Sequence, residues 1–141
     1  MKLDKPLYIV GIITIVMTLI FIISISYMVF FPFEPVTFNY DKFKILTPEV
    51  KGGDSVKFES SYCRKMDVPV VISRQLINTY LYFYPDVIGM TSLGCQKRVV
   101  TLKIPTTSEK GEYFVRNTYR YQVNTLREVV YVKDTEKFKV V

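Results

Sequence analysis

The sequence predicts an all-β domain, a sandwich of about seven strands, preceded by one N-terminal transmembrane helix. Residues 7–31 carry no charge and are almost entirely apolar, and about 20 such residues suffice for a helix to cross a bilayer. The rest of the chain is rich in Tyr, Phe and Val, with turn residues between short apolar segments, a pattern typical of strands. We therefore expect a cytoplasmic head (1–6), the helix (7–31), a linker (32–40) and an extracytoplasmic β-domain (41–141).

The apolar segment is predicted to be an uncleaved membrane anchor. It runs for 25 residues between Pro6 and Pro32, and proline is tolerated at a helix start and stops a helix at its end. Tyr8 and Tyr27 lie near its ends, where interfacial aromatic residues belong. A cleavable signal peptide has an apolar core of about 7–15 residues followed by small residues, and this segment has neither feature.

The flanking charges predict the orientation of the anchor. Lys2 and Lys5 precede it, offset by Asp4, whereas Glu34 and Asp41 follow it. Basic residues favour the cytoplasmic side. We therefore expect a single-pass protein with a cytoplasmic N-terminus and an extracytoplasmic C-terminal domain, in contact with membrane lipid.

Small residues on the anchor permit self-association. Gly11, Thr14 and Thr18 fall on or near one helical face, and small residues let membrane helices approach closely. The alternative is that Gly and Thr are simply common in membrane helices. No ionisable residue lies at membrane depth, so an ion pathway through this helix is not expected.

The strands are predicted from the alternation of apolar and polar side chains. The predicted strands are residues 43–47, 55–63, 68–78, 80–84, 98–104, 112–123, 127–133 and a short piece at 138–141. In two of them the expected inward side chains are Val56, Phe58 and Tyr62, and Val100, Leu102 and Ile104.

One local motif points to a more specific architecture. Tyr113 follows a corner at Gly111 and enters a strand whose apolar residues occupy alternate positions. This resembles the tyrosine corner of immunoglobulin-like sandwiches, and residues 109–141 resemble the closing strands of fibronectin type III domains. The resemblance implies an immunoglobulin-like sandwich. The chain contains no Trp and its cysteines are not at the two immunoglobulin positions, so no binding residues are carried over.

The same resemblance implies a disulfide between Cys63 and Cys95. Cys63 ends one predicted strand and Cys95 precedes another, and in a sandwich of this type those strands are antiparallel neighbours in one sheet. A disulfide indicates an oxidising compartment, which agrees with the orientation of the anchor. A zinc site or a reactive thiol is not expected, because the chain has no histidine.

Composition argues against several function classes. The net charge is +6, and Lys2, Lys5 and Asp4 together account for one unit of it, which leaves +5 on residues 32–141. Such a domain has either an ordinary solvated surface or an attraction to anionic headgroups or acidic glycans. The charges are scattered without a nucleic-acid-binding motif. Without His or a Gly-rich phosphate loop, we expect no catalytic, cofactor or metal site.

The leading functional expectation is a membrane-anchored recognition or scaffolding module with a protein partner at the membrane. Its candidate interaction face combines Tyr80, Tyr82 and Tyr84 with Arg116 and Arg120, because Tyr and Arg are enriched at binding hot spots. The alternative is that these strand residues fill the core. Two other functions stay open: a phage or prophage envelope accessory protein, in lysis control or superinfection exclusion, and a small accessory subunit of a membrane complex.

Overall fold

The computed structural model describes residues 5–89 and 92–141, so Lys2 and Asp4, on which the predicted orientation partly rests, lie outside the described residues. The chain divides into two compact units. One comprises the residues up to 33 together with 124–127, and the other comprises residues 34–123 with 128–141. Each unit is described separately.

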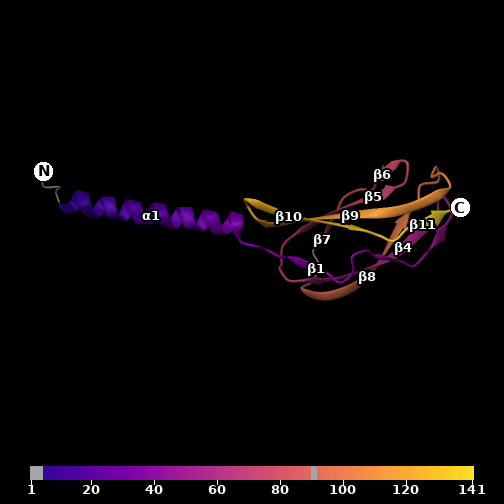
Figure 1. Ribbon diagram of the computed structural model, residues 1–141, viewed down its shortest axis with the longest axis horizontal. Helices are drawn as coiled ribbons and strands as arrows, with labels where there is room; N and C mark the ends of the chain where they lie inside the picture. The colour runs from indigo at the N-terminus through magenta and orange to yellow at the C-terminus, as the bar shows by residue number, and fades with distance from the viewer. Residues whose placement is uncertain (1–4, 90–91) are drawn as a thin grey trace. The chain divides into compact units, whose positions relative to one another are not determined.

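The first unit is dominated by one long helix, α1 (Lys5–Phe30), drawn in indigo and purple in Figure 1. Its segment Tyr8–Phe30 has 23 residues and a mean hydropathy of 2.8. At 1.5 Å per residue it is about 35 Å long, and the hydrocarbon core of a bilayer is about 30 Å thick. The prediction of an N-terminal helix that is long and apolar enough to cross a membrane is thus confirmed.

The described part of the second unit is built from strands. Their bounds are β1 Val36–Phe38, β2 Lys44–Ile45, β3 Glu49–Val50, β4 Ser55–Arg64, β5 Val70–Ile77, β6 Leu81–Phe83, β7 Val87–Gly89, β8 Gly94–Lys103, β9 Gly111–Asn124, β10 Arg127–Asp134 and β11 Phe138–Val140.

These strands form two sheets (Figure 1). In the first sheet β4 is central: β1 and β2 pair with one of its edges and β8 pairs with the other. The second sheet has the order β3-β11-β9-β5-β6, with β10 also on β9 and β7 also on β5. The pairing of β3 with β11 is parallel, whereas β5 and β9 pair antiparallel over eight residues.

The core lies between the inner faces of the two sheets, which contribute to one hydrophobic cluster. On β4, Val56, Phe58 and Tyr62 are buried, as the alternation predicted. Leu102 and Ile104 are buried as well, and Val100 packs against the same cluster. The prediction of inward side chains from period-two alternation is therefore confirmed for these two strands.

The short strands depart from the prediction. The predicted linker (32–40) contains β1, whose Val36 pairs with Arg64 of β4 and is 2% exposed. The strands β3 and β7 were also not predicted. Strands of two or three residues are too short to show alternation, and it is the pairing with a longer neighbour that holds them in place.

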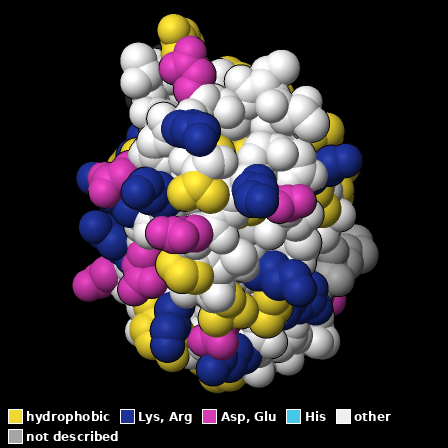
Figure 2. Space-filling model, turned by 90° about the vertical axis from the view of Figure 1, so that its right-hand side faces the viewer, with side chains coloured by type: hydrophobic (Ala, Val, Ile, Leu, Met, Phe, Trp, Pro, Cys, Tyr) yellow, Lys and Arg dark blue, Asp and Glu magenta, His cyan; other side chains and the backbone are white. Residues whose placement is uncertain are grey.

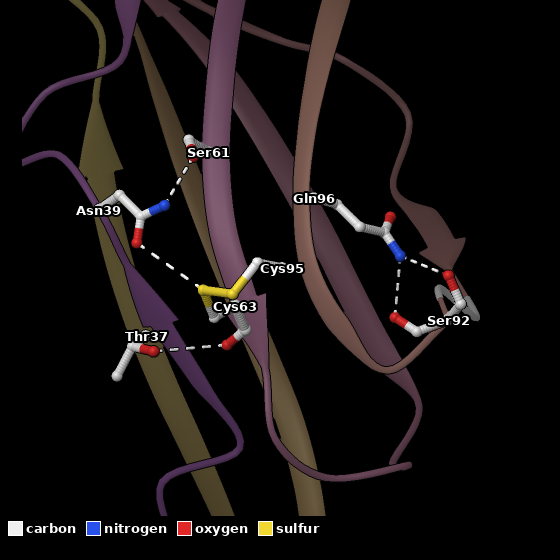
Figure 3. The surroundings of a disulfide bond; sticks show 7 residues. All are labelled: Thr37, Asn39, Ser61, Cys63, Ser92, Cys95 and Gln96. Atoms are coloured by element: carbon white, nitrogen blue, oxygen red, sulfur yellow. Dashed lines mark hydrogen bonds between the residues drawn. A yellow bond between two sulfur atoms is a disulfide. The ribbon is translucent and has the colours of Figure 1, made fainter.

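The disulfide between Cys63 and Cys95 is present, which confirms the predicted bond (Figure 3). The two cysteines are direct partners in the β4–β8 register. Beside them, Asn39 Nδ2 donates a hydrogen bond to Ser61 Oγ over 2.7 Å. The disulfide therefore joins two neighbouring strands within the first sheet and does not join one sheet to the other.

Tyr113 fixes the corner that leads into β9. Its hydroxyl donates a hydrogen bond to the carbonyl oxygen of Glu109, four residues upstream, over 2.8 Å. The ring is 6% exposed and lies against Phe138 with ring centroids 6.2 Å apart. A buried ring and a bonded hydroxyl together hold the turn before β9 against the core.

Candidate functional site

A cleft between β8 of the first sheet and β5 and β7 of the second is the candidate functional site, and we call it the inter-sheet cleft. Its volume is about 280 Å³. The lining residues that matter below are Ser60, Arg74, Val87, Arg98, Val99 and Tyr119. The walls are mainly aliphatic and aromatic, and two arginines reach into it.

Arg74 points inward because of its position on β5. It pairs with Asn117 of β9, and the Asn117 side chain is fully buried. Directly opposed residues of antiparallel strands project from the same face, and Val70 and Leu76, at even spacings along β5, are also buried. Arg74 thus occupies one of the alternate positions of β5 whose other side chains face the core.

Arg98 reaches the cleft from the other sheet. It pairs with Ser60 of β4, which is 2% exposed, so Arg98 projects from the inner face of β8. Its Nε donates a hydrogen bond to Gln96 Oε1 over 3.1 Å. Since β8 lies at an edge of its sheet in the described structure, this side chain stands at the mouth of the cleft.

The two cleft arginines have no acidic partner among the described residues. None of the ion pairs found there involves either side chain, and Arg74 Nε is buried without a hydrogen-bond acceptor. By contrast, the buried Arg64 donates to the carbonyl oxygen of Met66 over 3.0 Å and to Asp67 Oδ1 over 3.2 Å. A buried hydrogen-bond donor without a partner lowers the free energy of unfolding by about 1–3 kcal/mol, so the burial of Arg74 Nε destabilises the β-domain.

The electrostatics of the cleft favour an anion. Burial lowers the pKa of Arg74, and the neighbouring Tyr119 opposes this shift; a guanidinium nevertheless stays charged in proteins at neutral pH. Burial raises the pKa of Tyr119 and, together with Tyr62, raises the pKa of Tyr121 to about 12. The cleft therefore presents fixed cations and protonated phenols, both of which bind carboxylate or phosphate oxygens.

The predicted interaction face is divided between two faces of the second sheet. Tyr82 pairs with Leu76, which is 1% exposed, so Tyr82 lies on the inner side at the edge of the sheet. Arg116 pairs with Gln75 and projects from the outer side. The five residues thus do not form the single face that we predicted, because the pairing register that separates them is not visible in the sequence.

The five predicted residues are also differently engaged. The Tyr84 hydroxyl donates to the carbonyl oxygen of Lys103 over 2.9 Å, and burial raises its pKa to about 12, whereas Tyr80 is 68% exposed. Arg116 Nε forms an ion pair with Asp134 at 2.9 Å. Arg120 forms one with Asp86 at 3.1 Å. Both outer arginines therefore already have carboxylates, although Arg120 Nε, like Arg74 Nε, is buried without an acceptor among the described residues.

A second hollow, also of about 280 Å³, lies beside Tyr80 and Tyr82. Tyr113 contributes to it, but its hydroxyl is bonded to Glu109. Glu109 is the one charged side chain among the described residues that line this hollow, and it is exposed. The hollow therefore lacks a desolvated polar group that would select a ligand, and we place the site in the inter-sheet cleft.

The surface charge outside the cleft is mixed. On the face drawn in Figure 2, basic and acidic side chains are interspersed. Several lysines have acidic partners, for example Lys65 with Glu34 at 3.0 Å and Lys137 with Glu112 at 3.1 Å. Within the described residues no group of three or more His, Cys, Asp or Glu side chains could hold a metal ion.

The two cleft arginines were not singled out from the sequence, although a signal for each is present. Arg74 has the same phase as Val70 and Leu76 in the predicted strand 68–78, and Arg98 lies two residues before the inward Val100. A charge in the inward phase of an alternating strand is therefore the sequence feature that marks this site.

Comparisons with known proteins give no family. No protein-family model matches the sequence, and no curated protein matches it. Among solved structures, the chain is similar to Pseudomonas fluorescens alkylpurine DNA glycosylase AlkC bound to DNA containing an abasic site analog, with 10% identity and a TM-score of 0.45 over 78% of this chain and 31% of that one. It is also similar to a β-glucosidase from Listeria innocua, with 12% identity and a TM-score of 0.40 over 75% of this chain and 16% of that one.

Proposed function

We propose that this protein is a single-pass, membrane-anchored recognition module whose β-domain binds an acidic segment of a partner protein in the inter-sheet cleft, on the non-cytoplasmic side. The observation that carries the proposal is the guanidinium of Arg74, which lies in the cleft with a buried Nε that finds no acceptor in the described part of the chain. Buried polar groups are normally bonded, so an acceptor supplied from outside the chain accounts for its retention.

Two features support the anchored, extracytoplasmic placement. The helix α1 is long and apolar enough to span a bilayer. The bond between Cys63 and Cys95 fits an oxidising compartment. The hydroxyls of Thr14 and Thr18 donate to backbone carbonyls within the helix, over 3.0 and 2.9 Å, so these donors are already used and we assign recognition to the β-domain rather than to a helix-docked subunit.

We further propose that the β-domain is an immunoglobulin-like sandwich. The hydrogen bond from Tyr113 to Glu109 has the form of a tyrosine corner at the start of a late strand. The two-sheet arrangement, with β1, β2, β4 and β8 on one side and β9 and β5 at the centre of the other, also supports it. Sandwiches of this type commonly work by binding, although the fold alone does not assign a function.

The proposal concerns the binding of an acidic ligand. The test uses the full chain in nanodiscs of zwitterionic lipid, with fluorescein-labelled hexaglutamate as the acidic probe and hexaglutamine as the uncharged one. Fluorescence anisotropy is expected to show binding of hexaglutamate alone. The double variant Arg74→Gln, Arg98→Gln should weaken it at least about tenfold, because hydrogen bonds to charged groups contribute roughly 1.5–3 kcal/mol each.

The matched control is the double variant Arg116→Gln, Arg120→Gln, which removes the same charge from the outer face of the second sheet. It should keep affinity within about twofold, because neither Arg116 nor Arg120 lines the inter-sheet cleft. Long-range attraction to net charge changes equally in both double variants, so it cannot account for a difference between them. Equal weakening in the two would show diffuse attraction to a basic protein, and absence of charge-dependent binding would refute an acidic ligand; either result would overturn the proposal.

A further inference from the structure

The strand β8 has one edge with which no described strand pairs, and this free edge borders the inter-sheet cleft. The carbonyl oxygens of Lys57 and Ser61 on β4 accept hydrogen bonds from the β2 and β1 side, from Leu46 N over 2.8 Å and Asn39 N over 3.1 Å. Successive residues of a strand in an antiparallel sheet direct their backbone groups to opposite neighbouring strands. The residues of β4 between Lys57 and Ser61 in phase with Ser60 therefore bond to β8, and Ser60 bonds to its partner Arg98.

The backbone groups of the intervening residues point the other way. Lys97, Val99 and Thr101 direct their N–H and C=O groups away from β4, and no other described strand pairs with β8. The carbonyl oxygen of Lys103 has the same phase, and it accepts the Tyr84 hydroxyl. The free edge thus runs along the mouth of the cleft and carries donors and acceptors that no described residue uses.

The register of an added strand would bring its side chains into the cleft. A residue paired directly with Arg98 would project from the inner face, as Arg98 does, with the two Cβ atoms about 4.5–5.5 Å apart. An acidic residue at that position would meet Arg98 first and Arg74 behind it, because both line the same cleft. Its neighbours two positions away would pair with Gln96 and Val100, and the one beside Val100 would face the apolar wall that Val100 and Val87 form.

We propose, resting on the function proposed above, that the partner segment binds in extended form as an added strand on the free edge of β8, with an acidic side chain directed to Arg98 and Arg74. Main-chain hydrogen bonds to Lys97, Val99 and Thr101 supply affinity, and the cleft supplies specificity, as in other cases of strand addition. An apolar segment is rejected because it would bury the two guanidinium groups without acceptors.

Charges near a free edge commonly protect it from association with other chains. That role describes Lys97, which is on the outer face and pairs with Glu59 at 3.0 Å. It does not describe Arg74, which lies on a different sheet from β8 and has a buried, unbonded Nε. Arg98 and Arg74 would exclude an apolar strand and accept an acidic one. The same charges can therefore protect the edge from unwanted association and select its ligand.

The experiment selects binders from a displayed library of random octapeptides, using the full chain in zwitterionic nanodiscs. Enriched peptides are expected to carry an acidic residue with an apolar residue two positions away, on the side that pairs with Val100. The most enriched peptide is then measured against Val99→Pro, which removes a free-edge N–H while keeping the bonds to β4, and against Val99→Thr, which keeps that N–H. Val99→Pro should weaken binding at least about tenfold, and Val99→Thr should leave it within about twofold.

Amide hydrogen exchange on the unaltered chain tests strand addition without relying on a proline variant. Binding should slow exchange at Lys97, Val99 and Thr101, and Thr101→Pro repeats the test at a second position. If binding needs Arg74 and Arg98 but ignores both prolines, with no slowed exchange, strand addition is wrong and the proposed function stands. Binding of polygalacturonate without binding of any peptide would make the ligand an acidic glycan, and both proposals would then fail. If the enriched peptides lack acidic residues and ignore the arginines, both proposals fail.

Discussion

At the residue scale, two arginines show how the same side chain can stabilise or burden the β-domain. Arg64 is 3% exposed and donates to the carbonyl oxygens of Met66 and Val68. Arg74 is half-buried, and its Nε has no acceptor. A bonded buried guanidinium holds the chain after β4 in place, whereas a buried donor without an acceptor lowers stability.

The substitution Arg74→Met should therefore raise the free energy of unfolding by about 1–3 kcal/mol, because it removes an unbonded buried donor and fills the space with an apolar chain. It should also abolish hexaglutamate binding. Urea unfolding of the full chain in detergent, followed by near-ultraviolet circular dichroism of the tyrosines, measures this change. As the control, Arg64→Met should lower stability by at least about 1–3 kcal/mol. Destabilisation by Arg74→Met would show that this guanidinium is a structural group.

The position of Arg74 could be predicted from the sequence, but the absence of an acidic partner for it among the described residues could not. The alternation from Val70 to Leu76 places it on the inner face. Whether a carboxylate meets it depends on which strands face β5, and that is set by long-range pairing. The same limit explains the predicted face: Tyr82 and Arg116 both lie on the second sheet, but the register places them on opposite sides.

At the scale of elements, the length of a strand determined whether the sequence could predict it. The pair β4 and β8 shares ten residue pairs, and each strand is long enough for alternation to mark it in the sequence. The short β1 acquires its conformation from β4, with which it pairs over three residues, so local sequence could not reveal it. The disulfide lies at the end of the long ladder, where Cys63 and Cys95 are partners.

Replacing Cys63 and Cys95 together by Ser should lower the free energy of unfolding by roughly 3–4 kcal/mol, mainly because the unfolded chain is no longer constrained. The β-sheet signal in circular dichroism should persist, since the hydrogen bonds between β4 and β8 do not depend on the sulfurs. Urea unfolding measures the loss from the midpoint and the slope together, because the unconstrained unfolded chain is less compact and changes the slope as well. Dithiothreitol should cause the same shift in the unaltered chain and none in the double variant. An unchanged midpoint would assign the disulfide no stabilising role.

At the scale of the whole molecule, the broad class followed from composition and the finer arrangement did not. An uncharged apolar segment predicted a helix able to span a bilayer, and the helix is present. The Tyr-, Phe- and Val-rich remainder predicted strands, and strands make up most of it. The grouping of strands into sheets and the cleft between them depend on contacts distant in sequence, which periodicity does not encode.

The orientation in the membrane gives the last prediction. In intact cells, a membrane-impermeant maleimide should label no cysteine until an impermeant reductant opens the bond between Cys63 and Cys95, because both sulfurs are engaged. Labelling after reduction would place the β-domain outside the cytoplasm, where an acidic partner would have to be sought. With both cysteines replaced by Ser, Lys2→Cys should be labelled only after lysis. Thiols reachable only in lysed cells would instead put the β-domain in the cytosol, and the anchor would then hold the cleft toward intracellular partners.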